Sequence, residues 1–275
     1  MTTGELTYRE HPLETGCAGV LRVVWSLRGT ATAALPEPIV PDGCAELVFN
    51  VGDPIDAQAP QPGAGFTRQP RAMLVGPTTR PMFVRPGRAV DVVGMRLEPW
   101  ATGLLGIPAR DLRDRAVALD ELSGAARRFA GAAVDEIGRD RRLPRLQRLL
   151  AAEFAPAAAA AVSAQPLVQL IRRNGQTPSL RQLAAILGRS VRSVQRSFAE
   201  AVGIGPKLLS RLARVQRALR LAADAPAEPW IRIAVRAGYY DQAHFIREFS
   251  ALVGMLPSQY RPERESLTTA FVERR

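Results

Sequence analysis

FAEAVGIGP, residues 198–206, has a near-copy 51 residues further along the chain, FSALVGMLP at 249–257. Both copies place a phenylalanine, a valine, a glycine and a proline at the same spacing. Glycine accepts the left-handed backbone conformation that ends many helices, and proline suits the first turn of the next helix. The repeat therefore predicts two helices of the same kind, each held to its own core by Phe198 or Phe249. We expect the repeated residues to have a purely structural role.

Each copy closes a pair of short helices. In the first unit, a helix that ends at Gly188 precedes the helix over 191–202. In the second unit, a helix ends at Gly238, and Asp241 is placed to cap the helix that follows. Two short helices around a glycine turn form a helix-turn-helix pattern, which by itself is also common in proteins that do not bind DNA. A helix that starts at Pro206 separates the units, and its roughly 18 residues would span about 27 Å.

Positive charge is concentrated on the part of the chain that contains the repeat. The whole chain carries a net charge of +11, of which residues 166–261 carry +10 and residues 1–165 carry +1. A basic excess confined to one domain is typical of a site for a polyanion. An arginine-rich coding bias is the alternative. It explains arginine in place of lysine, but not the scarcity of acidic residues in one domain alone.

Residues 166–261 resemble the DNA-binding domain of the AraC/XylS family of bacterial transcription regulators. The stretch AGYYDQAHFIREFSALVGMLPSQYR, residues 237–261, is close to the family's signature throughout. The resemblance implies a domain of seven helices, of which the third and the sixth enter successive major grooves of double-stranded DNA. It also implies a sequence-specific transcription regulator with RNA polymerase as a further partner. The sequence does not fix whether such a regulator activates or represses.

The residues that read bases must lie on the face of each recognition helix opposite its buried aromatic residue. Arginine pairs bidentately with guanine and glutamine with adenine. The positions that match the family's base-contacting slots are Arg192, Gln195 and Arg196 in the first unit and Gln242 and Arg247 in the second. His244 is a further candidate, which either contacts a phosphate or packs. Four arginines are candidates for phosphate contacts, with surface charge as the alternative: Arg172, Arg173, Arg211 and Arg214.

The amino-terminal third predicts a β-rich sandwich or barrel, because short runs rich in β-branched and aromatic residues alternate with turn-forming stretches. VPDGCAELVFNVGDP, residues 40–54, resembles the amino-terminal domain of a subset of AraC-like proteins and predicts a turn followed by an alternating strand. The Pro- and Gly-rich segment over 53–71 predicts a mobile loop. If the sheet closes around a cavity for a small-molecule effector, five residues are candidates to line it, with packing as the alternative: Trp25, Glu46, Asn50, Arg96 and Trp100.

The predicted fold class is α+β with three parts. A β-rich effector-binding domain covers 1–105, a helical extension and linker covers 106–160, and the tandem helix-turn-helix domain covers 166–262. Apolar residues at intervals of three and four predict the helices of the middle part. These helices would either form the interface of a homodimer or pack on the sheet of their own chain.

Other classes of protein find little support in the sequence. Cys17 and Cys44 lack the spacing of metal ligands, and the only two histidines lie in different predicted domains. No nucleophile elbow, phosphate-binding glycine loop or zinc-protease motif is present, so we expect no enzyme activity, metal or cofactor. A non-specific architectural DNA-binding protein and an enzyme domain fused to a DNA-binding module remain as alternatives. Without a signal peptide or membrane-spanning run, we expect a cytoplasmic chain with no membrane partner.

Overall fold

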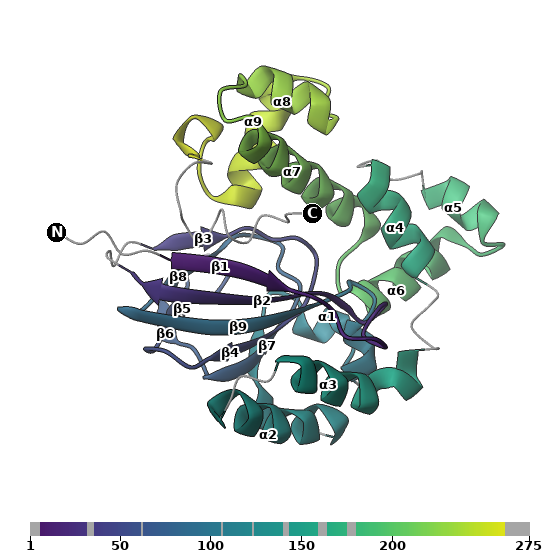
Figure 1. The fold of residues 1–275 in the computed structure, drawn as a ribbon. Coiled ribbons are helices and arrows are strands. Elements are labelled where there is room, and N and C mark those ends of the chain that lie inside the picture. The colour runs from purple at the N-terminus through teal and green to yellow at the C-terminus, as the bar shows by residue number, and fades with distance from the viewer. Residues whose placement is uncertain are drawn as a thin grey trace.

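A β-rich domain, a pair of helices that covers it and a helical carboxy-terminal domain follow one another along the chain (Figure 1). The computed structural model describes residues 6–31, 36–61, 63–105, 107–122, 124–139, 143–158, 164–174 and 180–261. The α+β class predicted from the sequence is confirmed. Within the described ranges, no helix is both long enough and apolar enough to cross a bilayer.

Two antiparallel sheets form the β-rich domain in the described part of the chain. The larger sheet runs in the order β1 (Leu6–His11), β2 (Leu21–Thr30), β9 (Ala89–Leu97), β4 (Glu46–Asn50), β7 (Ala72–Val75), β10 (Ala116–Ala118). The smaller sheet runs in the order β3 (Glu37–Ile39), β8 (Met82–Arg85), β5 (Asp56–Gln58), β6 (Phe66–Arg68).

The larger sheet separates two hydrophobic cores, as β4 illustrates. Leu47 and Phe49 are buried in the core that the helices share. Val48 points the other way and packs with the core between the two sheets. Successive side chains of a strand point to opposite faces, so the alternation predicted for this stretch is confirmed. The side chain of Glu46 shares the face of Val48, and this places it between the sheets.

The segment predicted as a mobile loop is instead part of the smaller sheet, so this prediction was wrong. Strands β5 and β6 pair as a hairpin, and β5 also pairs with β8. Across the hairpin, the guanidinium of Arg68 donates to Asp56 at 2.6 Å. Gln58 Nε2 donates to the carbonyl of Ala64 at 2.6 Å. Pairing with a strand distant in the sequence fixes this segment, and local turn-forming composition cannot reveal such a partner.

The range 106–160, which was predicted to be helical, also contributes a strand. The helical turns η1 (Thr102–Leu105), α1 (Ala109–Leu112) and η2 (Leu119–Glu121) surround β10, which pairs with β7 at the edge of the larger sheet. A helical prediction over 116–118 was therefore wrong. An unpaired edge strand leaves backbone donors and acceptors exposed, and β10 satisfies those of β7.

Two amphipathic helices, α2 (Gly124–Arg139) and α3 (Leu143–Ala158), pack against each other and against the larger sheet (Figure 1). Phe129 of α2 and Leu146 of α3 share a core with Leu74 of β7. Gln147 of α3 accepts a hydrogen bond from the backbone N–H of Glu14 at 2.8 Å, which ties the helix to the chain after β1. Of the two predicted roles, packing on the sheet of the same chain is present in the structure. Homodimerisation stays a prediction.

The carboxy-terminal domain follows the predicted order of helices. In the described residues it contains six α-helices: α4 (Gln165–Asn174), α5 (Leu180–Ile186), α6 (Val191–Val202), α7 (Pro206–Asp224), α8 (Trp230–Ala237) and α9 (Gln242–Val253). The seventh helical element is a short 3₁₀ turn, η4 (Pro257–Gln259). Helix α7 begins at the predicted proline and joins the two helix-turn-helix units (Figure 1). The third and sixth helices of this domain are α6 and α9.

The repeated glycines end their helices and also lie against the β-rich domain. Gly203 after α6 and Gly254 after α9 have φ values of 80° and 83°, the left-handed region that favours glycine. A Cβ atom on Gly203 would lie 2.8 Å from Pro77 Cγ, and one on Gly254 would lie 2.9 Å from Phe83 Cζ. Both units therefore contact the β-rich domain through the end of their second helix. The sequence repeat predicted the first role of these glycines but not the second.

Candidate nucleic-acid interface and ligand cavity

Helix α6 is held by one face and exposes the other. The Ser190 side chain caps its first turn by accepting from the N–H of Ser193 at 3.1 Å. Val194, Phe198 and Val202 bury the inner face. Three of the predicted base-reading residues lie exposed on this helix, within its first six residues: Arg192, Gln195 and Arg196.

Helix α9 repeats this construction. Asp241 Oδ1 accepts from the N–H of His244 at 2.7 Å, so the predicted cap is present. Phe245 and Phe249 are buried and pack against Trp230 of α8, with ring centroids 5.7 and 5.2 Å from the indole. The exposed predicted readers on this helix are Gln242 and Arg247. The side chain of His244 is half-buried and meets the ring of Tyr239 edge-on at 5.4 Å.

A buried carboxylate joins α9 to α7. Glu248 of α9 accepts from Arg211 Nε at 2.7 Å and from Arg214 Nη2 at 3.1 Å, and His244 Nε2 lies 3.4 Å from it. Burial raises the pKa of Glu248, but the two arginines lower it more, so the pKa lies below its usual value. Two predicted phosphate contacts, Arg211 and Arg214, therefore already pair with a carboxylate of the protein. A hollow of about 360 Å³ beside them is lined by Lys207, Arg211, His244, Arg247 and Glu248.

Arg172 of α4 points towards the β-rich domain. One of its guanidinium nitrogens lies 4.0 Å from Glu98 and donates to Cys44 Sγ at 3.6 Å. Only 14% of the side chain is exposed, so in this arrangement the residue serves the contact between domains. The side chain of Arg173 lies outside the described residues.

A cavity of about 100 Å³ lies between the two sheets. Its wall is mostly apolar and draws on both sheets, with Val48 and Met73 from the larger one and Met82 and Val84 from the smaller one. Gly94 of β9 lies directly beneath the Trp25 ring, which occupies the space a Cβ would need. The aromatic ring of Trp25 therefore forms part of the cavity wall.

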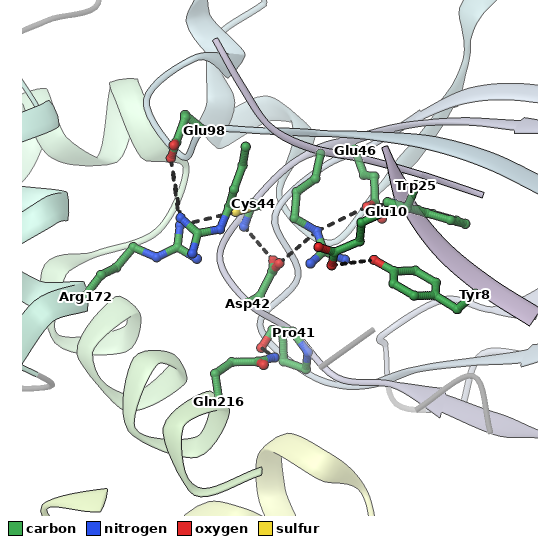
Figure 2. A network of polar contacts seen from close by, with 12 residues as sticks. Tyr8, Glu10, Trp25, Pro41, Asp42, Cys44, Glu46, Glu98, Arg172 and Gln216 are labelled. Atoms are coloured by element: carbon green, nitrogen blue, oxygen red, sulfur yellow. Dashed lines mark hydrogen bonds and ion pairs between the residues drawn. The ribbon is translucent and has the colours of Figure 1, made fainter. Parts of the chain in front are cut away.

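One end of the cavity is polar (Figure 2). Arg96 Nε lies 3.1 Å from Asp42 Oδ2 and 3.1 Å from Glu46 Oε1, and the arginine side chain is only 5% exposed. Trp25 Nε1 donates to the same Glu46 oxygen at 2.6 Å. Burial raises the pKa of Glu46, although Arg96 acts to lower it. Three of the predicted pocket residues thus meet here: Trp25, Glu46 and Arg96.

The two other predicted pocket residues do not line this cavity. Asn50 lies at the end of β4, where its amide donates to the carbonyl of Asp53 at 2.8 Å and accepts from the N–H of Gly52. Trp100 is buried and donates from Nε1 to the carbonyl of Gly19 at 3.0 Å. Asn50 thus stabilises the backbone next to it, and Trp100 bonds to backbone 81 residues away in the sequence. The alternation of side chains along β4 predicted Asn50 on the cavity face, but β4 ends at this residue.

The turn Pro41–Cys44 belongs to the cavity wall and to the contact between the domains (Figure 2). The Pro41 carbonyl accepts from Gln216 Nε2 of α7 at 3.2 Å. A Cβ on Gly43 would lie 2.6 Å from Leu209 of α7, so the helix packs directly on the turn. Asp42 accepts from the N–H of Cys44 at 2.8 Å and thereby holds the turn in shape. The sequence indicated the turn but not its neighbours.

Residues 183–263 match the model of a helix-turn-helix domain family, and residues 15–118 match a domain of unknown function (DUF6597). Among solved structures, ToxT from Vibrio cholerae is similar with 10% identity and a TM-score of 0.48, over 94% of this chain and 98% of that chain. The C-terminal domain of AraT, a response regulator from Geobacillus stearothermophilus, is similar with 28% identity and a TM-score of 0.34, over 37% and 84%. No curated protein matches the sequence.

The range that matches the helix-turn-helix family contains two capped helices with exposed arginine and glutamine side chains. These features define a DNA-binding protein whose β-rich domain lies amino-terminal to the DNA-binding domain. Its carboxy-terminal domain is of the AraC type, and the chain is a DNA-binding transcription regulator. The resemblance inferred from the sequence is confirmed. In the described residues, no group of three His, Cys, Asp or Glu side chains is placed to hold a metal ion.

Proposed function

We propose that the protein recognises specific DNA sequences with α6 and α9 in two successive major grooves. We further propose that a small molecule in the cavity between the sheets modulates this binding. The observation that carries the proposal is that both helices are built alike. Each has a capped start, a buried aromatic and exposed Arg and Gln side chains near its amino-terminal end.

Electrostatics support the choice of a polyanion as the partner. The net charge of +10 over 166–261 would release counterions from DNA, so affinity should fall steeply with salt. Helix α7 has 19 residues and so is about 28 Å long, close to the roughly 34 Å that separates adjacent major grooves on one face of DNA. These features favour two readers acting on one face of the duplex.

The side chains available distinguish this function from non-specific architectural binding. Phosphate contacts alone position a protein without reading sequence. Arg and Gln can form bidentate pairs with guanine and adenine, each worth about 1–3 kcal/mol of discrimination. The exposed faces of both helices offer such side chains, so sequence readout is the better account.

The turn at 41–44 supports effector control. It forms part of the cavity wall and also contacts α7 through Pro41 and Gly43 and α4 through Cys44. A ligand that displaces Asp42 would move a segment on which the helices of the DNA-binding domain pack. Effector binding would thereby change how the reading helices are held.

Selection of binding sites from random duplexes tests the reading function. For the full chain we expect two preferred patches of sequence about one helical turn apart. Arg196→Ala should relax preference in one patch and Arg247→Ala in the other, each by about 1–3 kcal/mol, because each removes one bidentate donor. Arg113→Ala, an exposed arginine of the β-rich domain, is the matched control and should leave both patches unchanged. Loss of the same patch in both variants would show that the two helices do not read separately.

A further inference from the structure

The polar end of the cavity has an unequal number of positive and negative groups. Arg96 supplies one guanidinium, whereas Asp42 and Glu46 supply two carboxylates, each 3.1 Å from Arg96 Nε. All three side chains line the cavity. If both carboxylates are ionised, one negative charge has no positive partner among the three groups. Buried charges are stable only when they are paired, so this end favours an added positive charge.

The rest of the cavity selects a compact hydrocarbon. Aliphatic and methionine side chains from both sheets form most of its wall, and the Trp25 ring forms another part. An apolar cavity of 150 Å³ in another protein accepts a single benzene ring. This cavity of about 100 Å³ is smaller but partly open, so a short branched chain fits inside and one small ring is the upper limit. Indole is also the aromatic ring that attracts a nearby cation best.

We propose that this cavity binds a compact apolar amine, whose ammonium group pairs with Asp42 and Glu46 while its hydrocarbon part fills the apolar region. This inference rests on the proposed effector role of the cavity and names the chemical class of the effector. The ammonium group would compete with Arg96 for Asp42. Since Asp42 lies in the turn that contacts α4 and α7, the head of the ligand would act next to the contact between the domains.

An organic anion fits the same site poorly. Its carboxylate would need the Arg96 guanidinium, whose Nε already lies 3.1 Å from both Asp42 and Glu46. Binding would bring a third carboxylate towards one buried positive charge, and like charges in a buried site repel strongly. An ammonium group instead stabilises the ionised form of Glu46, so a protonated Glu46 would release its proton on binding.

Three probes with the same ring separate these chemistries: benzylamine, benzyl alcohol and benzoate. Calorimetry and thermal shift of the full chain should detect benzylamine binding. Benzyl alcohol should bind at least about tenfold more weakly and benzoate not at all, because only the amine supplies the missing charge. Binding of benzoate in preference to benzylamine, or of neither charged probe, would overturn the inference.

Two conservative variants locate the site. Asp42→Asn and Glu46→Gln each remove one negative charge and keep the shape of the side chain, so each should weaken benzylamine at least about tenfold. Asp56→Asn, which removes a partly exposed carboxylate of β5 outside the cavity, is the matched control and should bind benzylamine as the wild type does. Unchanged benzylamine affinity in both cavity variants would also overturn the inference. If one cavity variant fails to fold, the other variant and the three titrations of the wild type still test the inference.

DNA affinity, measured with and without benzylamine, separates this inference from the proposed function. Amine binding that leaves DNA affinity unchanged would support the ligand class and contradict the effector role. Specific DNA binding by a chain that binds no amine would contradict the ligand class and leave the reading function intact. A change in DNA affinity that Asp42→Asn abolishes would support both.

Discussion

Arg96→Met is expected to lower the free energy of unfolding of the β-rich domain by about 3–5 kcal/mol at neutral pH, because it leaves two buried carboxylates without their positive partner. The arginine side chain is only 5% exposed and lies 3.1 Å from both Asp42 and Glu46. Urea unfolding of the full chain, followed by tryptophan fluorescence, measures the effect, because Trp25 donates to one of the two carboxylates.

The matched control is Arg28→Met in β2. Arg28 lies 3.5 Å from Asp91, but about half of its side chain is exposed. Exposed ion pairs contribute about 0–1 kcal/mol, so this variant should unfold almost as the wild type does. Equal losses in the two variants would show that the buried triad is not what stabilises this end of the cavity. Acid titration offers a second check, since burial raises the pKa of Glu46 and its protonation should rescue Arg96→Met in part.

Phe249→Ala is expected to destabilise the second helix-turn-helix unit by about 3–5 kcal/mol, the usual effect of removing a buried phenylalanine ring. The ring is 0% exposed and contacts the rings of Trp230, Phe245 and Tyr260 at centroid distances of 5.2, 5.4 and 6.0 Å. Thermal unfolding of the full chain should show the loss. Binding to a selected DNA site should weaken at the patch that α9 reads.

Tyr240→Ala controls for the loss of an aromatic ring in the same unit. Its side chain is 96% exposed, so the variant should keep its stability to within about 0.5 kcal/mol. A Phe249→Ala protein as stable as Tyr240→Ala would mean that the repeated aromatic does not anchor its helix. The interpretation of the repeat from which the whole account starts would then be wrong.

Local signals in the sequence predicted the carboxy-terminal domain closely. Pro206 and the repeated glycines mark helix ends that depend on the backbone preferences of single residues. The exposed positions of Arg196 and Arg247 follow from the 3.6-residue period once the buried phenylalanines are placed. The cap by Asp241 was likewise predicted, because it involves only residues three apart.

Pairings between distant residues could not be predicted in the same way. Strand β10 and the hairpin β5–β6 exist because remote strands satisfy their backbone groups. The contacts of Pro41 with Gln216 and of Cys44 with Arg172 span more than a hundred residues. Arg172 was predicted as a candidate for a phosphate contact, with surface charge as the alternative, because its carboxylate partner lies in another domain.

Hydroxyl-radical footprinting of the full chain on a selected duplex tests the central claim most directly. If α6 and α9 occupy successive major grooves, two protected stretches should appear on one face of the DNA, about one helical turn apart. Phe249→Ala should erase one stretch and leave the other. A single protected stretch, or uniform protection that does not depend on the sequence of the duplex, would contradict the account.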